Sequence, residues 1–354
     1  MYNTIYLYDL QMFADGPGVV TNTTTGTVNS YTGVEAPTTA LSATMKTFYD
    51  TELLENAREK LIFQQLGRKQ SLPAKHGKTV EWRKWNTLPH ADKLQEAVIP
   101  EGKVLGMTSM TVPIDQYGMY VSISDQLETH AIDDAILGAT EEVGASAGES
   151  YDKLVRAALM TGTNIMYADI MDEDGNFVSA PATRAALAAG KANVAYLTPK
   201  MVNKAVTALK KFKAPTYSGG KYVAVIHPSV AEDLRESKAW IEAHKYSATT
   251  QIFNGEIGEL HGVRFVESNL APIVKEGDTS VYLTMFFGRD AFGVVDPEGA
   301  GMETIIKNRG EIGGPLEQFS TIGTKFSMAA KILYNERMLI METLSSYSDI
   351  DDAN

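Results

Sequence analysis

The string GASAG at residues 144–148 matches a catalytic motif in form. It fits the G-x-S-x-G nucleophile elbow, in which a strained strand-to-helix turn exposes the serine hydroxyl. Apolar residues on both sides of Ser146, however, recur at the three- and four-residue spacing of a helix. We therefore predict that Ser146 lies in mid-helix, where small residues allow close packing. A serine hydrolase is kept as an alternative function, with Ser146 as the residue that a fluorophosphonate probe would label.

Two other patterns suggest a ligand site, and each lacks a required residue. The string HGKT at 76–79 resembles the end of a phosphate-binding loop, but Leu72 stands where that loop needs its first glycine. Asp172 and Asn176 suggest a calcium loop without its closing bidentate glutamate, so we predict a hairpin turn there. The six histidines include no pair at the spacing of zinc ligands. The sequence thus predicts no catalytic residue, no metal and no cofactor.

Composition narrows the class of protein further. The chain has 354 residues, a formal net charge of -12 and no cysteine. Without cysteine there are no disulfides, thiolate metal sites or cysteine nucleophiles. The acidic balance argues against a protein whose main task is to bind phosphate backbones, so we expect no specific DNA binding. No apolar run approaches the roughly 20 residues needed to cross a bilayer, and no membrane association is predicted.

The first third of the chain predicts extensions rather than a compact domain. Residues 16–44 are rich in Thr, Gly, Ser and Asn and have no helical period, which indicates an arm. A helix is expected at 41–66, and a long two-stranded β-hairpin at 67–112. This hairpin segment begins with a cluster of basic residues: Arg68, Lys69, Lys75, Lys78, Arg83 and Lys84.

A long acidic helix follows the hairpin segment. Residues 117–124 alternate like a half-buried strand, and residues 125–161 then show a helical period. One helix of this length would be about 50 Å long, well above the average in compact domains. Its outer face carries a row of acidic residues, among them Glu128, Asp133, Asp134, Glu141 and Glu142.

The remainder of the chain reads as an α/β unit and a long strand. Thr198 and Pro199 predict the start of a helix. Strands and helices then alternate to about residue 305. Residues 325–342 alternate apolar and mixed positions, and we predict a single strand much longer than average there.

The order of local strings along residues 40–345 resembles the major capsid proteins of tailed phages of the coliphage N-four type. No single string is distinctive, and their order carries the resemblance. The strings are FYD at 48–50, IF at 62–63, GKTVE at 77–81, QYG at 116–118, SD at 124–125, DKL at 152–154, GTN at 162–164 and HP at 227–228.

The resemblance implies an α+β chain with the Hong Kong 97-type capsid fold. The implied parts are an N-terminal arm at 1–40, an N-terminal helix at 41–66, an extended loop at 67–112, a peripheral domain at 113–197 with a spine helix at 125–161, an axial α/β domain at 198–305, and a return to the peripheral domain with a C-terminal tail at 306–354.

The resemblance also implies function and partners. The chain is expected to assemble with itself, in hexamers and pentamers, into an icosahedral shell that encloses double-stranded DNA. Further expected partners are a separate scaffolding protein, a portal protein and, as an open question, a decoration protein. Synthesis in the bacterial host cytoplasm and a final place in the virion are implied. An encapsulin-like nanocompartment of the same fold is kept as an alternative.

Charge suggests how one subunit could meet the next. Contacts in such a shell are heterologous, so one surface of a subunit docks on a different surface of its neighbour. We expect the basic hairpin segment from Arg68 to Lys84 to dock across the acidic face of the long helix in an adjacent subunit.

Overall fold

The computed structural model describes most of the chain after residue 60. The described residues are 19–20, 61–73, 77–86, 88–93, 99, 102–130, 135–172, 176–192, 194–237, 240, 256–297, 302–312 and 316–354. They fall into two compact units. Unit 1 draws on 1–58, 116–150 and 299–327, and unit 2 on 59–115, 151–298 and 328–354. Each unit is described by itself.

Unit 1 is built on a small sheet with helices beside it. Its strands and helices are β1 (Val19–Val20), most of β5 (Asp115–Ser124), β15 (Glu303–Lys307), the first part of β16 (Phe319–Ile332), α2 (Asp125–His130), the first part of α3 (Ala135–Leu159) and α8 (Arg309–Ile312). β5 pairs with β1 and with β16, and β15 pairs with β16.

Glycines allow β5 and β16 to approach closely in unit 1. A Cβ atom on Gly118 would lie 2.9 Å from the carbonyl oxygen of Thr324, and one on Gly323 would lie 3.0 Å from that of Met119. Beside these strands, Ile123, Leu127 and Ile322 form a buried apolar cluster. That cluster fixes α2 on the sheet.

Unit 2 contains a seven-stranded sheet with most of the buried apolar side chains. The strand order is β10-β11-β9-β13-β17-β6, and β12 also pairs with β13. All nine residues of β13 are buried, as expected of a central strand whose two faces are both covered. The strands are β6 (Ile165–Tyr167), β9 (Tyr222–Ile226), β10 (Glu256–Leu260), β11 (Val263–Glu267), β12 (Ile273–Glu276), β13 (Thr279–Phe287) and β17 (Met338–Thr343).

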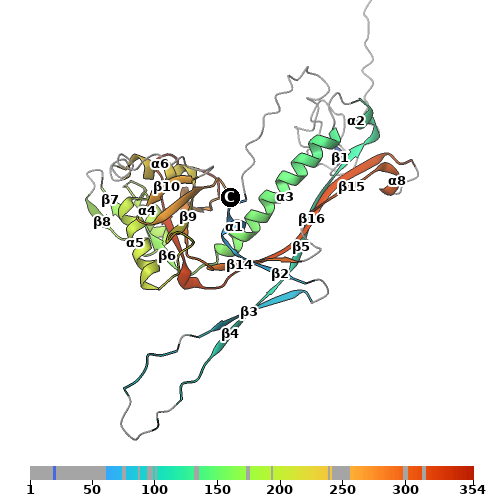
Figure 1. Ribbon diagram of the computed structural model, residues 1–354. Helices are drawn as coiled ribbons and strands as arrows, with labels where there is room; N and C mark the ends of the chain where they lie inside the picture. Colours follow the sequence, from blue (N-terminus) through green and yellow to red (C-terminus); the bar gives the residue numbers. More distant parts are fainter. Residues whose placement is uncertain are drawn as a thin grey trace, which may run out of the picture. The chain divides into compact units, whose positions relative to one another are not determined.

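Helices cover this sheet (Figure 1). They are α4 (Arg184–Ala189), α5 (Pro199–Lys211) and α6 (Pro228–Glu236), with a short helix η2 (Gly190–Ala192) after α4. The predicted helix at Thr198 and Pro199 is confirmed, and its periodic apolar residues, including Met201 and Leu209, are buried. The antiparallel pairing of β7 (Ile170–Met171) with β8 (Phe177–Ser179) confirms the hairpin predicted at Asp172.

Unit 2 contains a second group of strands, which includes residues 68–72 near the start of the unit. β2 (Arg68–Leu72) pairs in parallel with β14 (Phe292–Pro297), which pairs with residues 329–332 of β16. The short helix α1 (Phe63–Leu66) begins on the Asp152 carboxylate, which accepts hydrogen bonds from the backbone N–H groups of Ile62, Phe63 and Gln64 at 3.0–3.3 Å. Burial raises the pKa of Asp152, and these three N–H groups partly offset that rise.

The predicted single strand at 325–342 is wrong. β16 ends at Ile332, the short helix η3 (Asn335–Arg337) turns the chain, and β17 then pairs with β13 and β6. All six residues of β17 are buried, so this strand completes the α/β sheet rather than returning to a platform. The sequence also placed β14 within the α/β stretch 198–305, but β14 pairs with β2 and β16. Conversely, β6 precedes residue 198 and joins the seven-stranded sheet.

The long acidic helix is described in two pieces, α2 and α3, and residues 131–134 between them lie outside the described residues. The GASAG string lies inside α3, which confirms the helical interpretation of Ser146. The predicted arm at 1–40 and helix at 41–66 lie outside the described part of the chain, except for β1 and residues 61–66.

Candidate assembly surfaces

The hairpin of β3 (Thr79–Trp85) and β4 (Met107–Pro113) has a firmly packed root. The two strands pair antiparallel over seven residues each and run side by side in Figure 1. Val80 and Trp82 of β3 pack with Val112 of β4 against Val295 and Leu333. Trp82 sits so close to Gly293 that a Cβ atom there would lie 2.8 Å from its ring. The root is therefore seated on β14.

Two cation–π contacts with Tyr334 also hold this root. Lys84 Nζ lies 4.4 Å from the centre of the Tyr334 ring, and the Arg337 guanidinium carbon lies 3.8 Å from it. Lys84 also approaches the carboxylate of Glu336 at 3.6 Å. These contacts add electrostatic attraction to the apolar packing. Lys84 thus serves the subunit's own hairpin root.

The other described basic residues predicted for docking lie in or next to β2 and β3. Successive residues of a strand point to opposite faces, so Arg83 lies on the other face from Lys84. The Nε atom of Arg83 lies 3.2 Å from the Glu81 carboxylate. Lys78 Nζ lies 3.6 Å from the Asp115 carboxylate, and both side chains are mostly exposed. Arg68 and Lys69 are exposed in β2. Lys75 lies outside the described residues.

Of the five acidic residues named for docking, two have side chains that the structure describes. Glu128 in α2 pairs with Arg309 of α8 at 2.5 Å, within unit 1. Glu142 in α3 is exposed. Asp133 and Asp134 lie outside the described residues, as does the side chain of Glu141. The structure therefore leaves the predicted contact between basic hairpin and acidic helix as a prediction.

The sequence interpretation missed a row of exposed apolar side chains on the outer hairpin. Ile99 is 93% exposed and Val104 is 91% exposed, values that are unusual for large apolar residues. The only hint in the sequence is that these apolar residues follow neither a strand nor a helix period. The exposed members are Trp85, Leu88, Ile99, Val104, Leu105 and Met107.

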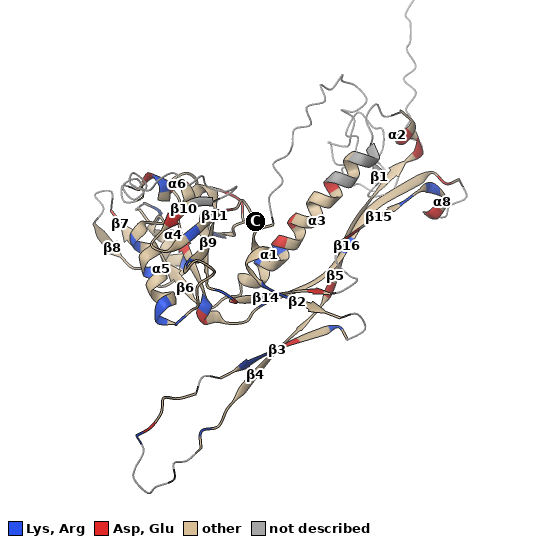
Figure 2. Ribbon diagram, in the orientation of Figure 1, with Lys and Arg blue, Asp and Glu red and all other residues tan. Residues whose placement is uncertain are grey.

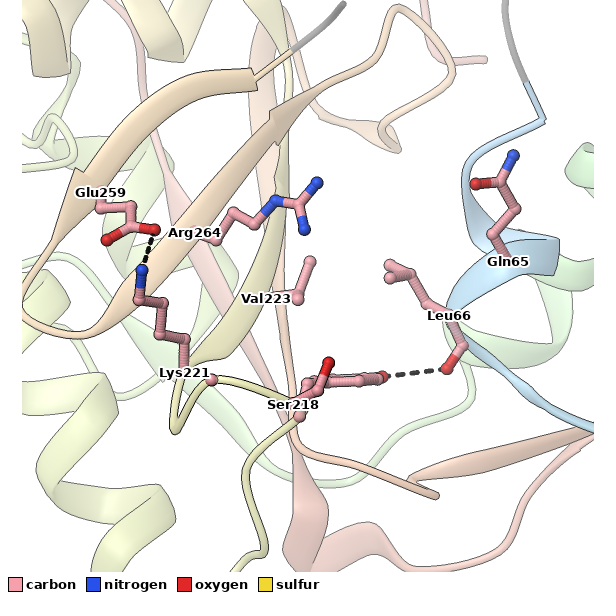
Figure 3. A pocket seen from close by; sticks show the side chains of 9 residues that line it. Gln65, Leu66, Ser218, Lys221, Val223, Glu259 and Arg264 are labelled. Carbon is pink, nitrogen blue, oxygen red and sulfur yellow. Dashed lines mark hydrogen bonds and ion pairs between the residues drawn. The ribbon is translucent and has the colours of Figure 1, made fainter. Parts of the chain in front are cut away.

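A hollow of about 420 Å³ lies beside α1 in unit 2 (Figure 3). Gln65 and Arg264 line it from facing elements, with Val223 between them. The Tyr217 hydroxyl donates to the backbone carbonyl of Leu66, and burial raises the pKa of that hydroxyl. Lys221 pairs with Glu259 at its rim. The hollow holds no histidine or cysteine to act as a base or nucleophile.

Two further features are absent from the described residues. They contain no group of three histidine, aspartate or glutamate side chains placed to hold a metal ion. No described helix combines the length and apolar character needed to cross a bilayer. Asp172 accepts hydrogen bonds from the backbone N–H and the side-chain amide of Asn176, as in a turn.

Several solved structures with similar folds are phage capsids. Capsid chains of Cyanophage P-SCSP1u and Cyanophage Pam1 each match with a TM-score of 0.62 at 14% sequence identity, covering 91% and 87% of this chain and 98% of each capsid chain. The capsid of Ralstonia phage GP4 matches with a TM-score of 0.59 at 14% identity, covering 84% of this chain and 91% of that one. No curated protein matches the sequence.

The similarity to these capsid chains shows that the chain has the Hong Kong 97-type fold. Residues 108–330 match the family described as phage capsid protein, and the chain belongs to that family. It is a major capsid protein, a structural component of the virion that associates with itself, and not an enzyme.

Proposed function

We propose that the β3–β4 hairpin completes its fold on a neighbouring subunit and thereby drives ring formation in the shell. The row of exposed apolar side chains from Trp85 to Met107 carries this proposal. Six large apolar residues in one segment are costly to leave in water, at about 25 cal/mol per Å² of apolar area. Burial on a second copy of the chain recovers that free energy.

The hairpin root supports this role because it fixes the direction of the exposed end. Trp82 on Gly293 and the cation–π contacts with Tyr334 hold β3 and β4 at their base. Preorganised surfaces bind more tightly, since less conformational entropy is lost on docking. A hairpin fixed at its root therefore presents its apolar end ready for a neighbour.

Charge is proposed to set where the hairpin docks. Lys78 and Arg83 are mostly exposed, and their ion pairs with Asp115 and Glu81 are of the exposed kind that contributes little stability. They remain able to face the acidic side of α2 and α3 in an adjacent subunit. Lys84 is left out of this proposal because it is engaged with Tyr334.

Rings of five and six subunits closing an icosahedral head around double-stranded DNA are the assembly proposed here. A separate scaffolding protein, a portal protein and a decoration protein are proposed partners, and synthesis in the host cytoplasm is the proposed origin. The N-four-like subfamily also stays a prediction, supported by the order of sequence strings from 48–50 to 227–228.

Electron microscopy of the chain expressed with its neighbouring genes tests the function itself. Closed shells are the expected result, and their diameter gives the size of the assembly. Folded chain that forms neither rings nor shells under these conditions would contradict the proposal.

The double variant Lys78→Glu/Arg83→Glu tests the electrostatic part. It should fold with an unchanged melting temperature and fail to form shells. A matched control is Lys307→Glu/Lys325→Glu, which reverses two exposed lysines on paired strands of unit 1. If the hairpin variant and the control assemble equally well, the hairpin charges do not select the docking surface.

A further inference from the structure

Opposite charges gather at opposite ends of β13 in the seven-stranded sheet. The residues from 198 to 221 include six lysines and no aspartate or glutamate, although the whole chain has a net charge of -12. Lys210, Lys211 and Lys213 stand together at the end of α5, and all three are exposed. Blue segments mark α5 in Figure 2.

This lysine group lies level with the last residue of β13. The Arg289 N–H donates to the carbonyl of Pro215, and the Tyr222 hydroxyl donates to that of Ala214, so the chain just after α5 is fastened beside Phe287. Among the described residues, none of the three lysines forms an ion pair. Between them, Phe212 is also exposed, at 47%.

The acidic group lies at the first residue of β13. Glu276 is the last residue of β12, and Asp278 lies in the turn before β13. The chain after β17 is tied to the same place, because the Ser280 N–H donates to the Asp349 carbonyl and the Ser280 hydroxyl to the Asp351 carbonyl. This group, which we call the acidic end, is Glu276, Asp278, Asp349, Asp351 and Asp352.

Internal pairing only partly neutralises the acidic end. Lys191 pairs with Asp349, and Lys275 pairs with Asp352, whose side chain is 96% exposed. Hydrogen bonds from Ser348 and Tyr282 lower the pKa of Asp351, which keeps that carboxylate charged. Two of the five carboxylates thus form ion pairs with lysines, and Glu276 also interacts electrostatically with Arg184. Asp278 forms no ion pair with a described residue, and the Asp352 side chain is largely exposed.

We infer that the lysine group of α5 docks on the acidic end of the next copy of this chain around a ring. β13 spans roughly 27 Å between the two groups, at about 3.3 Å per residue. Two complementary surfaces on different sides of one subunit are what a heterologous, ring-closing contact requires. Complementary charge also orients the subunits as they meet. This inference rests on the proposed function.

Paired charge reversals test the inference in the full chain, expressed with its neighbouring genes. Lys210→Glu/Lys211→Glu should reduce the yield of shells by roughly tenfold or more, because like charges would then face each other. Asp278→Lys/Asp352→Lys should do the same. The variant that carries all four changes restores complementary charge at every contact, and it should regain shells.

Several results would overturn the inference. Either double variant could assemble as well as the wild type, or the fourfold variant could fail to recover although its subunits melt normally. If lysine reversal left shells intact and lowered only the DNA that they retain, the lysines would face nucleic acid instead. Wild-type chain that forms no shells would count against the proposed function rather than against this contact.

Two further measurements keep the test decisive. Lys200→Glu reverses one exposed lysine at the other end of α5 and is the control for the single variant Lys211→Glu. This control should assemble normally. If the reversed chains unfold, the neutral variants Lys210→Gln/Lys211→Gln should make rings dissociate at lower salt than the wild type, because exposed charge pairs are screened by salt. An unchanged salt dependence would contradict the contact.

Discussion

The central strand β13 and the β3–β4 hairpin differ in how far their apolar side chains are buried. Every side chain of β13 is buried within its own unit, with Phe286 against Phe265. The hairpin buries Val80 and Trp82 at its root and leaves Ile99 and Val104 almost fully exposed. The difference separates a part of the subunit that folds on its own contacts from a part whose contacts are proposed to come from neighbours.

The largest expected loss of stability comes from a substitution in the central strand. Phe286→Ala should lower the free energy of unfolding by about 3–5 kcal/mol, because it removes a fully buried aromatic ring from the core. Urea unfolding of the dissociated subunit measures it. The matched change Ile99→Ser should alter unfolding by no more than about 0.5 kcal/mol, as for an ordinary surface substitution. Equal losses in the two variants would remove the distinction between the regions.

A buried ion pair gives the next effect. Glu342 of β17 has no exposed surface, and Arg184 of α4 donates to both of its oxygens at 2.6 and 2.9 Å. Arg184→Met should cost about 3 kcal/mol of unfolding free energy, since it leaves a buried carboxylate without its partner. The double variant Arg184→Met/Glu342→Gln should recover part of that loss. If Arg184→Met unfolds like the wild type, the pair does not hold α4 on the sheet.

The root of the hairpin predicts a smaller effect. Gly293→Ala places a Cβ atom 2.8 Å from the Trp82 ring and should cost about 1–3 kcal/mol through overpacking. It should also lower the yield of shells, because the hairpin would leave its seat. Gly102→Ala is the control, as nothing lies within 4 Å of its Cβ position. Identical melting temperatures for the two variants would show that the root is not tightly seated.

The smallest expected effect is the pH dependence of stability that arises from His227. Burial lowers the pKa of His227, whose ring lies 5.2 Å from that of Tyr282, although the Asp351 carboxylate opposes this shift. The unfolded chain therefore binds a proton more readily, and stability should fall as pH drops below about 6.5. The slope is at most about 1.4 kcal/mol per pH unit. His227→Asn should flatten this part of the unfolding curve, and an equal slope in both chains would contradict it.

Sequence patterns predicted the elements that are governed by local signals. Thr198, Pro199 and the periodic apolar residues after them located α5 correctly. The prediction failed at 325–342 because the alternation of β16 was extended across η3 into β17, whose six residues are all buried by pairing with β13 and β6. Such pairing joins residues that are far apart in the chain, and no local pattern encodes it.

The structure separates two of the residues that were predicted to dock together. Arg83 and Lys84 were grouped by charge, although successive residues of a strand point to opposite faces, and Lys84 belongs with Trp82 on the buried side. The seat of Trp82 on Gly293 could not be inferred, since the two residues lie far apart in the sequence. Nor does the sequence distinguish the buried Trp82 from the exposed Trp85 without the pairing partner of each.

Electron microscopy of Ile99→Ser/Val104→Ser beside the wild type tests the central claim most directly. Both side chains are exposed in the subunit, so the variant should unfold at the same urea concentration as the wild type. The account predicts folded subunits and no closed shells. Normal shells from this variant would contradict the claim that neighbouring subunits bury the hairpin's apolar end.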